Sequence, residues 1–309
     1  MSAPLCDNFE IPFHDIGPQE RTPRLALVAG PYNELNGLFV LVRLADFLNQ
    51  IYSGQRAGQH LRERVIIIPA INLAGASIRS PDRLSNKSDS NAMSPDNKTD
   101  DITQCIAVAV LKATRQAYYR VDIHASNLGE EVPQVRLYEP TDDERASACL
   151  FGLPAIIEQP INTVLSTHWI RSWRQYGGEN FVIQGGQAGS LQTIHCEVLF
   201  RALVAFLDRT GIVDGLILSK EEENLRYFGI HQTFAVLSEH SGIFVSRLEV
   251  GRWVQAGECL GFIYHGFTGE LRTEINAPVS GLVSTLRRQP LLCEGDFVAR
   301  ILTTEQSTG

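Results

Sequence analysis

The pattern of apolar and polar residues changes near residue 220 and divides the chain into two parts. Before that point, short apolar runs alternate with longer stretches in which apolar residues recur at helical spacing. The runs predict strands over residues 25–29, 65–70, 120–123 and 181–183, and the periodic stretches predict helices over 36–51, 102–118 and 190–210. Alternating strands and helices are typical of a mostly parallel sheet flanked by helices. Residues 1–220 are therefore predicted to form an α/β domain.

Residues 221–309 follow a different pattern. Over 241–302, short β-rich runs are separated by glycine turns about every ten residues, which indicates a small all-β barrel or sandwich. The pattern V-G-x-x-V-x-x-G-x-x-L-G, followed by I-x-A-P-x-x-G-x-V, is similar to the lipoyl/biotinyl barrel. The tip that would carry a modified lysine holds Ser280 instead. We therefore expect a packing or lid role for this domain and no carrier function.

A long polar stretch over residues 77–101 interrupts the α/β pattern after the second predicted strand. Loops of this length inside a compact domain are usually functional or disordered. Because this stretch leaves a strand end, we expect it to line a site.

Composition narrows the class of protein. The net charge of −8 leaves no basic excess for nucleic acid, and no apolar run is long enough to cross a membrane. The six cysteines are scattered singly, which is typical of reduced thiols. The N-terminal residues lack the basic start and apolar segment of a signal peptide. We expect a cytoplasmic protein with neither a nucleic-acid nor a membrane partner.

Polar residues that could take part in catalysis or binding follow the predicted strands. Glu34 precedes the first helix in G-P-Y-N-E-L-N-G, Asn91 lies in the polar stretch, His124 ends Asp122-Ile-His, and Gln184 begins Q-G-G. In order and spacing, residues from about 25 to 301 resemble the succinylglutamate desuccinylase/aspartoacylase family. The resemblance implies a carboxypeptidase-like α/β fold with an appended β domain. It also implies zinc-dependent hydrolysis of N-acyl amino acids.

Three positions depart from that family's pattern. Its first motif carries a zinc-binding histidine three residues before the glutamate, and here Pro31 stands before Glu34, with Tyr32 beside it. Proline has no ligating atom, and a tyrosine phenol is not among the usual zinc ligands. The alternative interpretation of Glu34 is an acid favoured by the dipole at the start of a helix.

The substrate-binding positions are partly retained. The family's asparagine–arginine pair corresponds to Asn91 and Ala92, so the guanidinium that would bind a carboxylate is missing. Arg79 and Arg83 in the same stretch could reach the site instead, or remain solvated. The resemblance assigns a further substrate-binding arginine to Arg136, whose alternative role is that of an exposed strand residue.

The resemblance assigns His124 to the third zinc ligand and the general-base position to Gln184. A carboxamide cannot accept the proton that a catalytic glutamate takes from metal-bound water. A rival alignment places the base near residues 195–197 on a strand. The helical spacing around His195 disfavours that alignment.

We therefore hypothesise a pseudoenzyme with a polar pocket around Glu34, Asn91, His124 and Gln184 that binds a small N-acyl amino acid or amide. It could also act as a partner of an active paralogue. We expect no bound metal, because two ligand positions, Glu34 and His124, fall short of the usual three. The alternatives are an active hydrolase whose zinc site is completed by Tyr32, Asp89 or His195, and a structural subunit of a hetero-oligomer.

Overall fold

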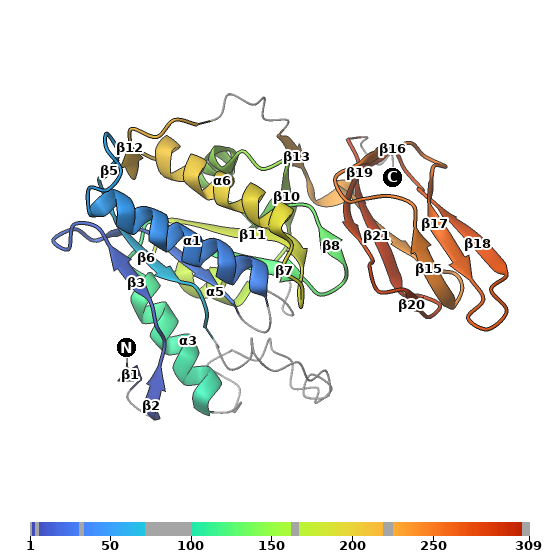
Figure 1. Cartoon of the computed structure of the whole chain (residues 1–309), viewed down its shortest axis with the longest axis horizontal. Coiled ribbons are helices and arrows are strands. Elements are labelled where there is room, and N and C mark those ends of the chain that lie inside the picture. The colour runs from blue at the N-terminus through green and yellow to red at the C-terminus, as the bar shows by residue number, and fades with distance from the viewer. Residues whose placement is uncertain are drawn as a thin grey trace.

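The computed structural model describes residues 2–3, 6–30, 34–71, 101–161, 167–218 and 225–304 (Figure 1). Five α-helices lie in this part of the chain: α1 Leu35–Tyr52, α3 Asp101–Thr114, α4 Asp142–Ala148, α5 Thr167–Arg174 and α6 Thr193–Arg209. Two short 3-10 turns, Cys149–Phe151 and Ile230–Gln232, accompany them.

An eight-stranded mixed sheet forms the centre of the α/β part. Its strands, in sheet order, are β13 Arg226–Phe228, β10 Ala155–Gln159, β9 Gln134–Tyr138, β11 Glu179–Gln187, β7 Tyr119–Ser126, β4 Pro23–Ala29, β6 Arg64–Ile68 and β3 His14–Ile16. Neighbours are parallel except for the β11–β9 and β3–β6 pairs. The predicted mostly parallel sheet is confirmed.

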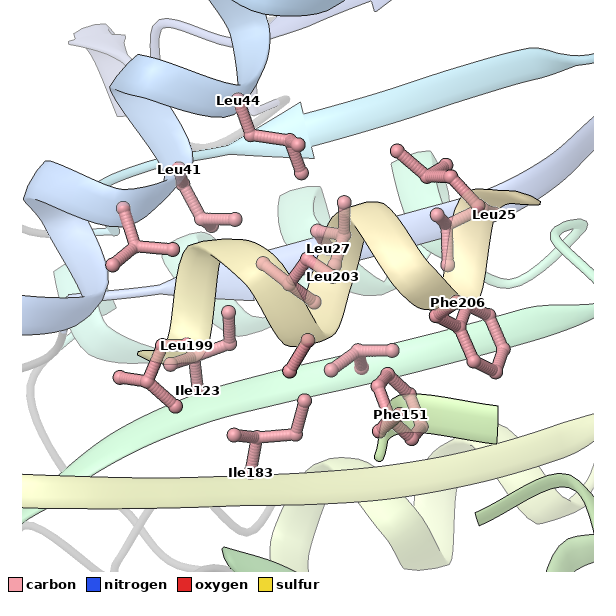
Figure 2. Close-up of a cluster of buried hydrophobic side chains, with 14 of the residues drawn as sticks. Leu25, Leu27, Leu41, Leu44, Ile123, Phe151, Ile183, Leu199, Leu203 and Phe206 are labelled. Carbon is pink, nitrogen blue, oxygen red and sulfur yellow. The ribbon is translucent and has the colours of Figure 1, made fainter. Parts of the chain in front are cut away.

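Helices cover both faces of this sheet, as its continuous apolar strands require. Helices α1 and α6 lie side by side on one face (Figure 1). There Leu27, Ile123 and Ile183 of the strands pack with Leu41 of α1 and Leu203 of α6 (Figure 2). The opposite face, with Val28 and Val182, packs against residues of α3 and α5. Alternate residues along each strand therefore belong to different cores.

Two antiparallel sheets make up the C-terminal part. The strands of the first are β14 Thr233–Leu237, β21 Phe297–Leu302, β19 Gly281–Leu286 and β16 Trp253–Val254. The strands of the second are β18 Leu271–Asn276, β17 Cys259–Tyr264, β15 Gly242–Ser246 and β20 Leu291–Leu292. A separate apolar core that includes Leu260, Ile263 and Val283 fills this part. The predicted all-β architecture is confirmed.

The two parts of the chain exchange strands. Strand β8, Glu130–Glu131, leaves the α/β part and pairs with β19 of the C-terminal sheet. Strand β13 lies beyond residue 220 but pairs in parallel with β10 of the large sheet. The predicted boundary at residue 220 remains a prediction, and the first described strand after it still belongs to the large sheet.

Short outlying pairs complete the described strands. β1 Ser2–Ala3 pairs with β2 Cys6–Glu10, and β5 His60–Leu61 pairs with β12 Val213–Asp214. The four predicted strands and three predicted helices are all present, with shifted ends. The helix predicted over 102–118 ends at Thr114, because the chain turns there to enter β7. No described helix combines the length and apolar character needed to cross a bilayer.

Phe206 of α6 should be a main source of stability. Its ring stacks on Phe151 at 4.1 Å and meets Tyr119 and Phe181 edge-on, and the side chain is 1% exposed. We expect Phe206→Ala to lower the free energy of unfolding by about 3–5 kcal/mol in urea denaturation, because it leaves a cavity. Ile194→Ala in the same helix, at a side chain that is 79% exposed, should change it by less than about 0.5 kcal/mol. Equal losses in the two variants would contradict this assignment of the core.

Candidate functional site

The register of three neighbouring strands places polar side chains in one row. His124 of β7 pairs with Gln184 of β11, and Gln184 pairs in turn with Gln134 of β9. Residues paired in this way project from the same face of a sheet. His124 and Gln184, predicted separately from the sequence, are therefore neighbours in the structure.

Carboxylates occupy both ring nitrogens of His124. Its Nδ1 lies 3.0 Å from Oε2 of Glu34, and its Nε2 lies 2.8 Å from Oδ2 of Asp122. All three side chains are withdrawn from solvent, and Asp122 is completely buried. The structure thus brings together Glu34 and His124, which are 90 residues apart in the chain.

The charges of these groups are interdependent. Burial opposes an imidazolium, but the neighbouring charges of Asp122 and Glu34 raise the pKa of His124 well above its ordinary value. Burial raises the pKa of Glu34, against the opposing effect of His124. The two carboxylates therefore favour the protonated imidazole, which can donate one hydrogen bond to each of them.

Glu34 contributes its carboxylate to this contact and does not cap the helix. It occupies the N-cap position of α1 without a side-chain hydrogen bond to the helix backbone. The backbone of Ala125 provides another hydrogen bond to the same carboxylate. The alternative interpretation of Glu34, an acid favoured by the dipole at the start of a helix, is compatible with this N-cap position and stays a prediction.

An amide pair fixes the start of α1 against the start of α6. Asn36 is 1% exposed. Its side-chain oxygen accepts a hydrogen bond from the backbone N–H of Gln192 at 2.9 Å, and its side-chain nitrogen donates one to Oε1 of Gln192 at 3.2 Å. The same oxygen of Gln192 accepts from the N–H of Gln187, at the end of β11. These bonds hold the residues next to Glu34 against the strand that carries Gln184.

A glycine bulge follows Gln184. The β11–β7 pairing shifts register between Gln184 and Gln187. Gly186 there has a φ of +76°, and a Cβ at this position would collide with the Asn36 side chain. A bulge of this kind re-aims the strand and commonly lies beside a functional site. Gln184 is partly exposed, and its carboxamide forms no hydrogen bond with another side chain or backbone group of the described ranges.

Arg136 lies in a buried ionic cluster that joins the two parts of the chain. Its Nη2 lies 2.9 and 3.0 Å from the two carboxylate oxygens of Glu131. Arg300 of β21 and Thr285 of β19 donate to the same carboxylate at 3.1 and 3.0 Å. Arg136 is therefore not an exposed strand residue, and an internal carboxylate already occupies its guanidinium. A ligand-binding role for Arg136 stays a prediction.

The Glu131 carboxylate accepts hydrogen bonds from two guanidinium groups, those of Arg136 and Arg300. Burial and the charge of Arg136 lower the pKa of Arg300, whereas Glu131 raises the pKa of Arg136 despite its burial. The Nε atom of Arg136 and the Oε1 atom of Gln134 are buried without a hydrogen-bond partner in the described part. The cluster carries an excess positive charge next to the row of Gln184 and His124.

The described residues do not make a zinc site. A catalytic zinc ion takes three protein ligands. Across the described residues, no group of three or more His, Cys, Asp and Glu side chains could hold a metal ion. Asp122 cannot serve as the third ligand beside Glu34, because it contacts the opposite nitrogen of His124.

Several predicted positions lie outside the described residues. These are Pro31, Tyr32, Arg79, Arg83, Asp89, Asn91 and Ala92. The rival alignment with a strand over residues 195–197 is wrong, because α6 covers them. His195 lies in that helix, with its Nε2 2.6 Å from Oε1 of Glu130.

Sequence reasoning missed four side chains that shape this region: Asp122, as a partner of His124, and Glu131, Gln134 and Arg300. Asp122 carried a readable signal, since residues two apart on a strand share a face. Glu131 and Gln134 are near Arg136 in the chain, but nothing in the sequence indicates that Arg300, 169 residues after Glu131, joins them.

Solved structures of several other proteins share this fold with the chain. The ectoine utilization protein EutE (DoeB) from Ruegeria pomeroyi, bound to product, is 22% identical with a TM-score of 0.70, over 92% of this chain and 86% of that one. A succinylglutamate desuccinylase/aspartoacylase from Rhodobacter sphaeroides is 19% identical with a TM-score of 0.70, over 91% and 86%. A protein from Shewanella amazonensis, described as belonging to the succinylglutamate desuccinylase/aspartoacylase family, is 13% identical with a TM-score of 0.70. The match covers 94% of this chain and 93% of that one.

The chain therefore has the fold of the succinylglutamate desuccinylase/aspartoacylase structures, with the C-terminal β domain. The sequence matches no family model and no curated protein. At identities of 22%, 19% and 13%, these likenesses show the fold and not the chemistry of the site.

The Glu131 carboxylate should be essential to the folded state. We expect Glu131→Gln to lower the free energy of unfolding by about 3–5 kcal/mol, because it leaves Arg136 and Arg300 buried without their carboxylate. Glu197→Gln is the control, since Glu197 pairs at the surface with Arg43 and Arg201 and should contribute less than about 1 kcal/mol. Urea denaturation at low and high salt measures both. A loss for Glu131→Gln that salt abolishes would contradict a buried cluster.

Proposed function

We propose that the protein is a non-hydrolytic member of this structural class that binds a small amide or N-acyl amino acid. The observation that carries the proposal is the closed contact of His124 with Glu34 and Asp122. Nδ1 of the imidazole faces Glu34 and Nε2 faces Asp122, and the described residues offer no third metal ligand beside Glu34 and His124.

The residue beside His124 also argues against hydrolysis. Gln184 pairs with His124 in register, at the strand end where the resemblance places a general base. A carboxamide can orient an amide ligand by donating to its carbonyl or accepting from its N–H. It cannot carry a proton from water to a leaving nitrogen, and loss of a general base typically costs about 10²–10⁴-fold in rate.

A rebuilt metal site is the second candidate, and one observation favours it. Glu34 and His124 approach each other to 3.0 Å, and Asp122 orients the far nitrogen of the ring, as carboxylates do behind metal-binding histidines. A third ligand would have to come from outside the described residues. The two candidates differ in metal content and in turnover.

We expect protein purified with zinc, without chelator, to hold well under one metal ion per chain. It should show no hydrolysis of succinylglutamate or acylated aspartate above the buffer rate. Gln184→Glu should not create activity, because restoring a base does not restore the missing ligand. Metal analysis by mass spectrometry and an amine-release assay measure these outcomes. Stoichiometric zinc together with turnover would overturn the proposal in favour of the rebuilt enzyme.

Ligand binding is tested separately with the same compounds by ligand-observed NMR. We expect N-acyl amino acids or simple amides to bind the parent protein and to bind Gln184→Ala at least tenfold more weakly, because the carboxamide contacts the ligand. Gln50→Ala on the exposed surface of α1 is the matched control and should bind as the parent does. Binding that Gln184→Ala leaves unchanged would place the ligand elsewhere.

A further inference from the structure

One sheet of the C-terminal part carries a row of apolar side chains across its outer face. The register pairs Leu291 of β20 with Ile243 of β15, and Ile243 with Tyr264 of β17. Tyr264 pairs in turn with Leu271 of β18. Residues paired in this way lie on the same face of a sheet, so the row crosses every strand from β20 to β18. Leu291 and Leu271, at its two ends, are 70% and 56% exposed.

A second row lies beside the first on the same face. Val245 of β15 pairs with Phe262 of β17, and Phe262 pairs with Glu274 of β18. Val245 is 48% exposed, and the rings of Phe262 and Tyr264 lie 6.4 Å apart. The two rows together form an exposed apolar patch on the order of a few hundred Å², a size that is often functional in a monomer.

The other faces of this β sandwich are already in use. Phe244 and Ile263 alternate with the exposed residues and lie in the core between the two sheets. The other sheet carries Thr285 and Arg300, which bond the Glu131 carboxylate of the α/β part. Figure 1 shows β17 and β18 on the side of the sandwich that lies away from the large sheet. Among the described residues, the patch is therefore the face of the sandwich that is still open to a partner.

The edge of the same sheet is less suited to association than its face. Strand β18 is the edge strand, and its register against β17 shifts between Leu271 and Thr273, which leaves Arg272 as an extra residue. Arg272 and Glu274 are both exposed. Bulges and charged side chains are features that keep an edge strand from pairing with another chain. A partner of this sheet is therefore expected on the face.

The face is complementary to itself. Strand β15 presents the aliphatic side chains of Ile243 and Val245, and β17 presents the rings of Tyr264 and Phe262 in the same two rows. A two-fold axis that runs along the strands between β15 and β17 lays the β15 of one copy over the β17 of the other. Each ring then meets an aliphatic side chain. Such isologous contacts are the commonest in homo-oligomers, and packed sheets keep their strands within about 30° of each other.

Opposite charges stand at the margin of this face. Arg247 follows Val245 by two residues, Glu274 ends the second row, and both side chains contact the thiol of Cys259. A standard interface buries about 800 Å² per partner, more than the apolar rows supply, so a second copy must also cover this margin. One charge of each sign lets two copies meet there without net repulsion. An anionic membrane would require the basic excess that this face lacks.

We propose that this face binds a second copy of the chain in a two-fold symmetric dimer, with Leu291 of each copy over Leu271 of the other. The proposal does not rest on the function proposed for the His124 site, and neither metal content nor ligand binding there tests it. The contact is small, so we expect a dissociation constant of about 1–100 μM.

Sedimentation velocity of the full chain over a range of concentrations tests the dimer. Reductant is present throughout, because Cys149 and Cys293 are exposed thiols that could crosslink two chains. We expect a monomer–dimer equilibrium in the parent protein. Leu291→Lys and Leu271→Lys should each weaken it at least tenfold, because each places a charge in the apolar contact. Both positions are exposed, so the variants should keep their fold, which circular dichroism checks.

Leu237→Lys is the matched control. Leu237 is 54% exposed and lies in β14 of the other sheet, so this variant should dimerise as the parent does. Charge reversal tests the margin separately. Arg247→Glu and Glu274→Arg each leave two like charges on the face and should weaken the dimer severalfold, whereas the double variant should recover the affinity of the parent.

Four outcomes would overturn the proposal. The chain stays monomeric at concentrations tenfold above the expected dissociation constant, or a dimer forms that Leu291→Lys and Leu271→Lys leave unchanged. Leu237→Lys weakens the dimer as much as they do, or the double charge reversal is as weak as the single ones. A different protein or a lipid vesicle that binds the parent in place of a second copy, and is lost in Leu291→Lys, would assign the face to that partner and also overturn the dimer.

Discussion

The arrangement of the candidate site depends on one buried carboxylate. Asp122 lies in the middle of a strand between Val28 and Val182 on the neighbouring strands, completely withdrawn from water. Burying an ionised carboxylate costs much free energy unless it is paired and hydrogen-bonded. His124, two residues along the same face, provides that partner, and Glu34 then neutralises the outer side of the ring. The residue that precedes α1 is therefore linked to the middle of β7 through a single imidazole.

The fold and the chemistry of this chain have separate requirements. The apolar residues that seat α1 and α6 on the sheet, and the glycines that allow close approach, do not take part in any reaction. A scaffold of this kind can be retained while the reacting residues change, because a fold does not determine an activity. The Asn36–Gln192 pair and the bulge at Gly186 keep Gln184 beside His124 whichever function the site performs.

How far the sequence predicts the structure depends on whether the signal is local. Strand β4 and helix α6 follow from apolar runs and helical spacing, and both lie where they were expected apart from their ends. The adjacency of His124 and Gln184 followed from the order of strand ends under the family resemblance. The ionic cluster of Glu131 could not be predicted, because Arg300 reaches it from a different domain. Helix α4 was also missed, although Thr141 and Glu144 form a capping box before it.

The exchange of β8 and β13 makes the two parts of the chain unsuitable for separation. A fragment that stopped at residue 220 would lack β13 and leave β10 as an unprotected edge, with its N–H and C=O groups open to other chains. The same cut would leave β8 without its partner β19. It would also remove Thr285 and Arg300, two of the hydrogen-bond donors to the Glu131 carboxylate. Such fragments would be prone to self-association. The molecule is thus built to fold as one cooperative unit, in which each part completes a sheet of the other.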